Sequence, residues 1–321
     1  MLEHGDLDRA LKIFSEAKRL CCVCHRNPDG DAVGAITAVA RLFEENFPDK
    51  TIALFCVDPA PPVFDFLAGV HRFKAELNPA AGDVFVFLDS AETKLTEYEE
   101  KHPQIFTNAF PSVGFDHHPT NTRYATVNFV VPEASSTCEI ITVFADAVKW
   151  RITPDTATSL LSGIYTDTGG LLHSNTTSRV YRTVARLLRA GARQQTIVQK
   201  VFRTAKPTTL RLWGRVLEKI TITEEGGAIS ALTEGDFRAT GADYSELTGA
   251  IDYVNAVPGM RFSLILAERA GKVKGSLRTL RDDVDVSKMA AKFQGGGHKK
   301  AAGFAVPGKL VPEVRWKVEN N

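Results

Sequence analysis

The side chains best suited to chemistry begin with a seven-residue stretch, His25-Arg26-Asn27-Pro28-Asp29-Gly30-Asp31, which combines an imidazole with two carboxylates. Such a set suits Mn, Zn or Fe rather than Ca alone. A glycine between the carboxylates gives the backbone freedom to bend at that point. The stretch therefore predicts a metal-binding loop in which Gly30 separates Asp29 from Asp31.

Three later segments carry the same kinds of side chain. Asp89 follows the apolar run at 83–88, where a helix N-cap is an equal alternative. Asp116-His117-His118 follows the run at 112–115, and Asp167 ends a helix-like stretch, where a turn carboxylate is the alternative. Together the segments exceed the needs of one ion and suit two divalent ions that share a carboxylate. The candidate ligands are His25, Asp29, Asp31, Asp89, His117, His118 and Asp167.

The elements that must position these residues are those of a parallel α/β sheet, whose strands present ligands at their carboxyl ends. Nearly continuous apolar runs are typical of strands buried on both faces, and helix-like spacing of apolar residues separates the runs. The expected strands are 20–24, 51–57, 83–88, 112–115 and 127–131, and the expected helices are 6–19, 32–46, 63–67, 138–148, 154–166 and 181–190.

A second, smaller domain is expected where the pattern changes. Residues 192–218 predict a helical connector with a break at Pro207. We therefore expect one domain at 1–191 and another at 219–321. The second would hold strands at 219–223, 228–232, 261–267 and 274–279, a helix at 286–293 and a glycine loop at 294–298.

The composition limits the classes of function. The 321 residues carry a net charge of +1, which argues against a long nucleic-acid groove but allows a local basic pocket. No apolar run approaches the roughly 20 residues that span a bilayer, and the N-terminus lacks a signal-peptide pattern. We expect a cytoplasmic protein with no membrane or long nucleic-acid partner.

The five cysteines do not indicate a disulfide framework, because their number is odd and their spacing irregular. Cys21 and Cys24 form a CxxC, but they lie in an apolar strand and no second CxxC follows. Buried core positions are therefore favoured for them, and for Cys56 and Cys138 as well.

The combined motifs resemble the DHH phosphoesterase superfamily, which is named after its Asp-His-His triplet. The matching segments are residues 25–31, Asp89, 116–118 and 167–169. Ser276-Leu277-Arg278 and Gly295-Gly296-Gly297-His298 resemble the associated C-terminal DHHA1 domain. The order and spacing of these motifs, and the length of the chain, are most similar to those of the nanoRNase/pAp-phosphatase branch. The resemblance implies an α/β fold: a parallel-sheet DHH domain with helices on both faces, a smaller α/β DHHA1 domain, and an active site in the cleft between them.

The resemblance also implies roles. The expected metal is Mn²⁺, with Mg²⁺ or Co²⁺ as alternatives. One ion would be held by His25, Asp29 and Asp89. A second would be held by Asp31, Asp89, His117 and Asp167, with Asp89 bridging. Asp116 would orient a histidine, and His118 would contact the scissile phosphate or protonate the leaving group. A metal-bound hydroxide would be the nucleophile.

Substrate binding is expected in the second domain. Glycine backbone N–H groups can cradle a phosphate, and Arg278 suits bidentate phosphate contact. Lys299 and Lys300 could equally form a solvated face. The resemblance implies that Ser276, Arg278, Gly295, Gly296, Gly297 and His298 hold the far end of a very short oligonucleotide. Gln294, Thr279 and Leu171-Leu172-His173 depart from the family pattern and put substrate preference in doubt.

The expected activity is hydrolysis of very short oligonucleotides, such as pApA or pGpG, to mononucleotides, and of pAp to AMP. A manganese-dependent pyrophosphatase or exopolyphosphatase and a cyclic-dinucleotide phosphodiesterase are rivals from the same superfamily. A nucleotide-binding sensor is the non-enzyme rival. A homodimer is compatible with the resemblance.

Overall fold

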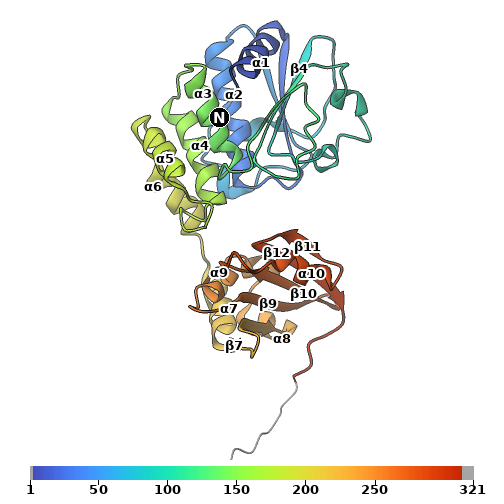
Figure 1. The fold of residues 1–321 in the computed structure, drawn as a ribbon, viewed down its shortest axis with the longest axis vertical. Helices are drawn as coiled ribbons and strands as arrows, with labels where there is room; N and C mark the ends of the chain where they lie inside the picture. The colour runs from blue at the N-terminus through green and yellow to red at the C-terminus, as the bar shows by residue number, and fades with distance from the viewer. Residues whose placement is uncertain (1–2, 313–321) are drawn as a thin grey trace, which may run out of the picture. The chain divides into compact units, whose positions relative to one another are not determined.

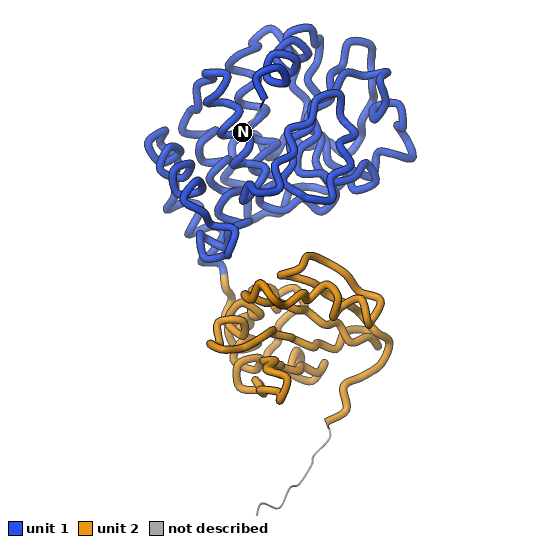
Figure 2. Tube along the Cα trace, in the orientation of Figure 1, with its two compact units in different colours: residues 1–204 blue, residues 205–321 orange. Residues whose placement is uncertain are grey.

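The computed structural model describes residues 3–312. The chain divides into two compact units, residues 1–204 and 205–321 (Figure 2). The division falls inside the segment expected as a connector. Helix α6 (Gln194–Ile197) and the π-helical turn η5 (Val198–Phe202) belong to the first unit, and α7 (Pro207–Glu218) belongs to the second.

The first unit is built on a six-stranded sheet in which every neighbouring pair of strands is parallel. The strand order is β3-β2-β1-β4-β5-β6, so the direction of winding reverses between β1 and β4. Ligands bind at such a reversal, outside the carboxyl ends of the strands. The strands are β1 (Arg19–Cys24), β2 (Thr51–Phe55), β3 (Phe73–Lys74), β4 (Asp83–Leu88), β5 (Ser112–Asp116) and β6 (Val127–Val130).

The two faces of this sheet are covered differently (Figure 1). One carries the long α-helices of the larger core: α1 (His4–Glu16), α2 (Gly30–Asn46), α3 (Thr137–Ala147), α4 (Pro154–Asp167) and α5 (Ser178–Arg189). The other is covered largely by short 3₁₀ segments and loops. The 3₁₀ segments of the unit are η1 (Pro62–Phe64), η2 (Val70–Arg72), η3 (Thr93–Thr96) and η4 (Pro103–Phe106).

The CxxC cysteines face opposite sides of the sheet. Cys24 belongs to the helical core and Cys21 to the core on the other face, as expected for residues an odd number of positions apart in a strand. All five cysteines are free and buried. The prediction of core positions is therefore confirmed, and the CxxC has no shared site.

The second unit has a mixed sheet in the order β11-β12-β10-β9-β8-β7. It contains β7 (Thr221–Ile222), β8 (Gly227–Leu232), β9 (Phe262–Arg269), β10 (Lys272–Arg278), β11 (Gly296–His298), β12 (Ala301–Pro307), α8 (Glu234–Thr240), η6 (Tyr244–Leu247), α9 (Ala250–Asn255) and α10 (Val286–Ala291). The sequence did not predict α8, α9 or β12. It also treated β11 as part of a loop, whereas these residues pair with β12 at the sheet edge.

No helix among residues 3–312 is long and apolar enough to cross a bilayer.

Candidate metal centre

The carboxyl end of the first sheet gathers all seven candidate ligands named from the sequence. Their ligand atoms form overlapping groups in which every atom lies within 4.8 Å of the others. Asp89 joins one group with His25 and Asp29, and another with His117 and His118. The remaining group is Asp31, His117 and Asp167.

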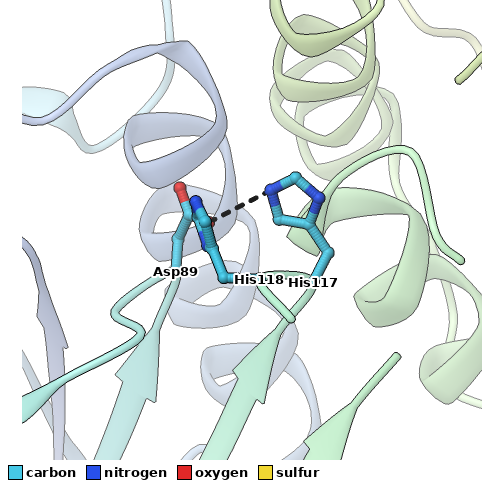
Figure 3. A group of neighbouring side chains, drawn as sticks. All are labelled: Asp89, His117 and His118. Atoms are coloured by element: carbon cyan, nitrogen blue, oxygen red, sulfur yellow. Dashed lines mark ion pairs between the residues drawn. The ribbon is translucent and has the colours of Figure 1, made fainter. Parts of the chain in front are cut away.

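Asp89 lies within 4.0 Å of His25 and of His117. Figure 3 shows Asp89 beside the two histidines of the triplet, His117 and His118. The Oδ2 of Asp89 is 3.7 Å from His25 Nε2, and its Oδ1 is 3.8 Å from His117 Nε2. It follows β4 in the left-handed region, at φ 55°, and its side chain is only 2% exposed. Non-glycine residues adopt this conformation uncommonly, so the fold holds one buried carboxylate in a special position between two ligand groups. It is not a helix N-cap.

The tautomer of His25 is fixed by its own loop. Its Nδ1 lies 2.7 Å from the carbonyl oxygen of Arg26, a contact that requires Nδ1 to carry the hydrogen. In the neutral ring, Nε2 then carries no hydrogen, and its lone pair lies on the side of Asp29 and Asp89. Burial opposes protonation, but hydrogen bonding to the two carboxylates outweighs it and raises the pKa of His25 to about 11. A bound cation would take the place of that proton.

Asp29 serves two purposes in the loop. It is the N-cap of α2, and its Oδ1 accepts hydrogen bonds from the backbone N–H groups of Asp31 and Ala32.

The expectation that Gly30 supplies a bend between the carboxylates is wrong. Gly30 is the first residue of α2 and does not have positive φ, whereas Asn27 does, at 48°. Glycine is needed at position 30 because a Cβ there would lie 2.4 Å from Thr166.

Asp31 is held by the N-terminus of α3. Its Oδ2 accepts from the backbone N–H of Thr137 at 2.6 Å, and its Oδ1 accepts from that of Cys138 at 3.0 Å. The positive end of the helix favours a carboxylate here. A Cβ on Gly163 would lie 2.6 Å from Asp31 Oδ1, so a glycine in α4 makes room for the buried side chain.

His117 and Asp167 complete the far side of the cluster. His117 Nε2 lies 3.3 Å from Asp167 Oδ2. Burial lowers the pKa of His117, which keeps the ring neutral, and a hydrogen bond to the backbone of Ala134 orients it. Asp167 is the last residue of α4, so a helix end delivers this carboxylate.

The second histidine of the triplet is bound to the triplet's own aspartate. His118 Nδ1 lies 2.7 Å from Asp116 Oδ1, and the backbone N–H of His118 donates to the same oxygen at 3.0 Å. Asn121 donates to the other oxygen at 2.6 Å. The hydrogen bond that the His118 ring donates to Asp116 raises the pKa of His118 to about 9, so this ring is protonated at neutral pH.

The charge of the cluster fits a divalent cation. Burial, with repulsion from Asp89 and Asp29, raises the pKa of Asp31 well above its usual value. Burial and repulsion from Asp31 and Asp89 do the same for Asp167. Among residues 3–312, no lysine or arginine pairs with these four aspartates within 4.0 Å. Oxygen and imidazole donors around concentrated negative charge are a suitable site for such an ion.

Two residues at this site were not predicted as functional. Thr137 donates its hydroxyl to Asp89 Oδ1 at 3.0 Å, in addition to its N–H bond to Asp31. Asn121 positions Asp116. Ser136 caps α3, and a serine of this kind before a helix is an N-cap signal that could have indicated a helix terminus at Thr137. Asn121 gave no comparable signal.

The residues expected to bind substrate lie in the second unit. Ser276 and Arg278 are on one face of β10 and line a pocket of about 340 Å³. Gly296, Gly297 and His298 form the edge strand β11. Gly295 and Gly297 have structural reasons to be glycine: a Cβ on Gly295 would lie 2.2 Å from the carbonyl oxygen of Gly303, and Gly297 has φ 140°. A Cβ on Gly296 would meet nothing within 4 Å.

Comparison with known proteins agrees with this architecture. Residues 19–164 match the DHH family, N-terminal domain, and residues 227–320 match the DHHA1 domain. The bifunctional oligoribonuclease and PAP phosphatase NrnA of Thermus thermophilus is 31% identical over 92% of this chain and 86% of that protein. Its namesake in Bacillus subtilis is 24% identical over 88% of this chain and 87% of that protein.

A solved structure shares the fold. An exopolyphosphatase-related protein from Bacteroides fragilis superposes with a TM-score of 0.84 at 23% identity, covering 97% of this chain and 93% of that one. The α/β fold with a second, smaller domain is thereby confirmed. The chain belongs to the DHH family, with a C-terminal DHHA1 domain; it is an NrnA-like protein and a hydrolase of the phosphoesterase class.

Proposed function

We propose that this enzyme hydrolyses very short oligonucleotides to mononucleotides, and pAp to AMP, with the help of two divalent metal ions, most often Mn²⁺. The observation that carries the proposal is the position of Asp89, whose two oxygens face different ligand groups. A carboxylate so placed can serve two ions at once. The NrnA proteins to which the chain is similar carry oligoribonuclease and PAP phosphatase in their names.

The ligands divide between the two ions. His25, Asp29 and Asp89 would hold one, and Asp31, Asp89, His117 and Asp167 would hold the other. When bound, such a pair of ions activates water and neutralises charge on a displaced phosphoryl group. Thr137 and the N-terminus of α3 keep Asp31 and Asp89 in place through hydrogen bonds.

His118 is proposed as the proton donor to the leaving oxygen. Its hydrogen bond to Asp116 holds a proton on the ring at neutral pH. A raised pKa keeps the proton available, which a general acid needs. Asp116 acts through this ring and, with Asn121 on its second oxygen, fixes the direction of the imidazole.

Ser276, Arg278 and residues 295–298 are proposed to bind the end of the substrate away from the cut. Arg278 has no carboxylate partner within 4.0 Å among the described residues, and this half-buried residue lines the pocket of the second unit. Gly296 supports the same role, because no packing contact requires glycine there.

The test is a ranking of kcat/KM with Mn²⁺ over pAp, pApA, pGpG, a short RNA, cyclic dinucleotides and pyrophosphate. The proposal expects pApA, pGpG, the short RNA and pAp to rank above the others. A higher rank for pyrophosphate would support the pyrophosphatase alternative, and a higher rank for cyclic dinucleotides would support a cyclic-dinucleotide phosphodiesterase.

A further inference from the structure

An exposed phenylalanine stands directly before the glycine loop of the second unit. Phe293 follows α10 and is 48% exposed. Its ring stacks on that of Phe304, with the ring centroids 4.5 Å apart and the planes 24° from parallel. Phe304 itself is buried, at 8% exposed. Phe293 therefore packs one side of its ring against the core of the second unit, and much of the remaining ring surface is open.

The buried ring of this stack is held in place by glycines. Phe304 lies opposite Gly275 in the pairing of β12 with β10, and a Cβ on Gly275 would lie 2.3 Å from the Phe304 ring. A Cβ on Gly295 would lie 2.5 Å from the Cβ of Phe304. The close packing fixes Phe304, which in turn supports Phe293. Aromatic side chains presented in this way bind nucleobases by stacking.

The residue after Phe293 has a strained backbone. Gln294 lies in the left-handed region, at φ 58°. Its N–H donates to the carbonyl of Ala291, and the next N–H, of Gly295, donates to that of Ala290, so hydrogen bonds at the end of α10 impose the turn. Glycine is the usual residue at such a place, because it has no Cβ. Strain of this kind is typical of functional sites, so the glutamine side chain requires a reason other than stability.

The amide of Gln294 is available to a ligand. Gln294 is exposed, and its side chain makes no hydrogen bond within residues 3–312. An amide presents a donor and an acceptor side by side. That pair matches the N6–H donor and N7 acceptor of adenine, whereas guanine presents two acceptors, N7 and O6, on the same edge. Because Phe293 and Gln294 are consecutive, a base stacked on the ring is within reach of the amide.

We propose that Phe293 and Gln294 form a base subsite that binds a purine and prefers adenine. The ring of Phe293 stacks on the base, and the amide of Gln294 makes two hydrogen bonds to its edge. This inference rests on the proposed function, in which residues 295–298 bind a phosphate of the substrate. One continuous segment, 293–298, then holds the base and the phosphate of a single nucleotide. A polyphosphate, which has no base, gains nothing from the subsite.

The test uses the full-length protein and two variants, Gln294→Gly and Phe293→Leu. Ala270→Gly is the matched control for the first, because Ala270 is also exposed and left-handed, at φ 48°, but lies in the hairpin between β9 and β10. Dissociation constants for pApA, pGpG and pUpU are measured without added metal. Thermal unfolding gives Tm, and KM and kcat are measured with Mn²⁺.

The expected result for Gln294→Gly is a loss of adenine preference without a loss of stability. The dissociation constant and KM for pApA rise about tenfold, the scale of one bidentate base contact. Values for pGpG change less than twofold, and kcat is unchanged. Tm does not fall, because glycine adopts the left-handed conformation freely. The control Ala270→Gly also keeps its Tm and binds all three dinucleotides as the wild type does.

Phe293→Leu should weaken the binding of both purine dinucleotides. The dissociation constants for pApA and pGpG rise about tenfold, the scale of base stacking on an aromatic ring. The effect on pUpU is smaller, because a pyrimidine offers less surface to the ring. The wild type accordingly binds pApA most tightly, then pGpG, then pUpU.

Other results overturn the inference. Equal changes for pApA and pGpG in Gln294→Gly, or none, would show that the amide does not read the base, and a lower Tm would show that glutamine serves the fold. Unchanged purine binding by Phe293→Leu would remove the stacking role. If the wild-type enzyme hydrolyses no dinucleotide, the proposed function fails, and the dissociation constants still decide whether the base subsite exists.

Discussion

The hydroxyl of Thr137 donates a 3.0 Å hydrogen bond to Asp89, the buried carboxylate between the two groups of metal ligands. The same residue donates its backbone N–H to Asp31. One threonine at the start of α3 therefore sets the positions of carboxylates that follow two different strands. Partners of this kind orient the residues that bind a metal.

We expect Thr137→Val to weaken Mn²⁺ binding about tenfold, because the isosteric change removes the donor to Asp89 while keeping the backbone bond to Asp31. Isothermal titration calorimetry on chelator-treated protein measures the effect. Thr142→Val is the matched control: its hydroxyl is buried in the same helix and bonds only the carbonyl of Cys138. Equal affinities for both variants and wild type would rule out the orienting role.

Metal affinity should depend steeply on pH. Burial and mutual repulsion raise the pKa values of Asp31 and Asp167, so protons compete with the ion for these carboxylates. Lowering the pH favours the protonated form, so the affinity for Mn²⁺ falls as pH falls, by about tenfold per unit for each proton displaced. Dissociation constants at pH 6, 7 and 8 test this, and a constant affinity over that range would contradict it.

The alkaline limit of turnover should follow His118. The hydrogen bond that His118 donates to Asp116 raises the pKa of His118 to about 9, so the proton needed by the leaving group is lost as pH rises through that value. Asp116→Asn removes the negative acceptor and should return the pKa towards about 6.5. The pH profile of kcat then shows its alkaline limb about two units lower, with little change at pH 6. An unmoved limb would mean that another group supplies the proton.

Substitutions at Gly295 and Gly296 distinguish a role in folding from a role in substrate binding. A Cβ on Gly295 would overlap the Gly303 carbonyl, so Gly295→Ala should cost about 1–3 kcal/mol of stability. Gly296→Ala meets nothing within 4 Å, so its Tm should match the wild type while its KM for pApA rises. Thermal unfolding and steady-state kinetics on both variants check the contrast. Wild-type kinetics for Gly296→Ala would remove this backbone from the substrate site.

The sequence was sufficient to predict the positions of the ligands that follow buried strands. The run at 83–88 is apolar from Val84 onward and forms β4 with those bounds, so Asp89 had to emerge at the carboxyl edge of the sheet. The triplet at 116–118 begins at the last residue of β5 and continues past the strand, so it lies at the same edge. These positions depend on the local pattern of apolar residues and on parallel pairing of the strands, and both could be predicted from the sequence.

Other features depend on contacts distant in sequence and could not be predicted. The hydroxyl of Thr137 reaches a carboxylate 48 residues away. The role of Gly30 was misjudged because its constraint is Thr166 in α4, not its own backbone angle. In the second unit, α8 and α9 have seven and six residues, too short for a clear helical period.

The account depends most directly on Asp89. Hydrolysis of pApA should be measured for the wild type and for Asp89→Asn, each after chelator treatment and again with saturating Mn²⁺. We expect the wild type to be inactive without metal and restored by Mn²⁺, and Asp89→Asn to fold with a similar Tm but stay at least 1,000-fold slower, about 4 kcal/mol of lost transition-state stabilisation. Wild-type turnover by Asp89→Asn, or full activity of the chelated enzyme, would contradict the two-metal site.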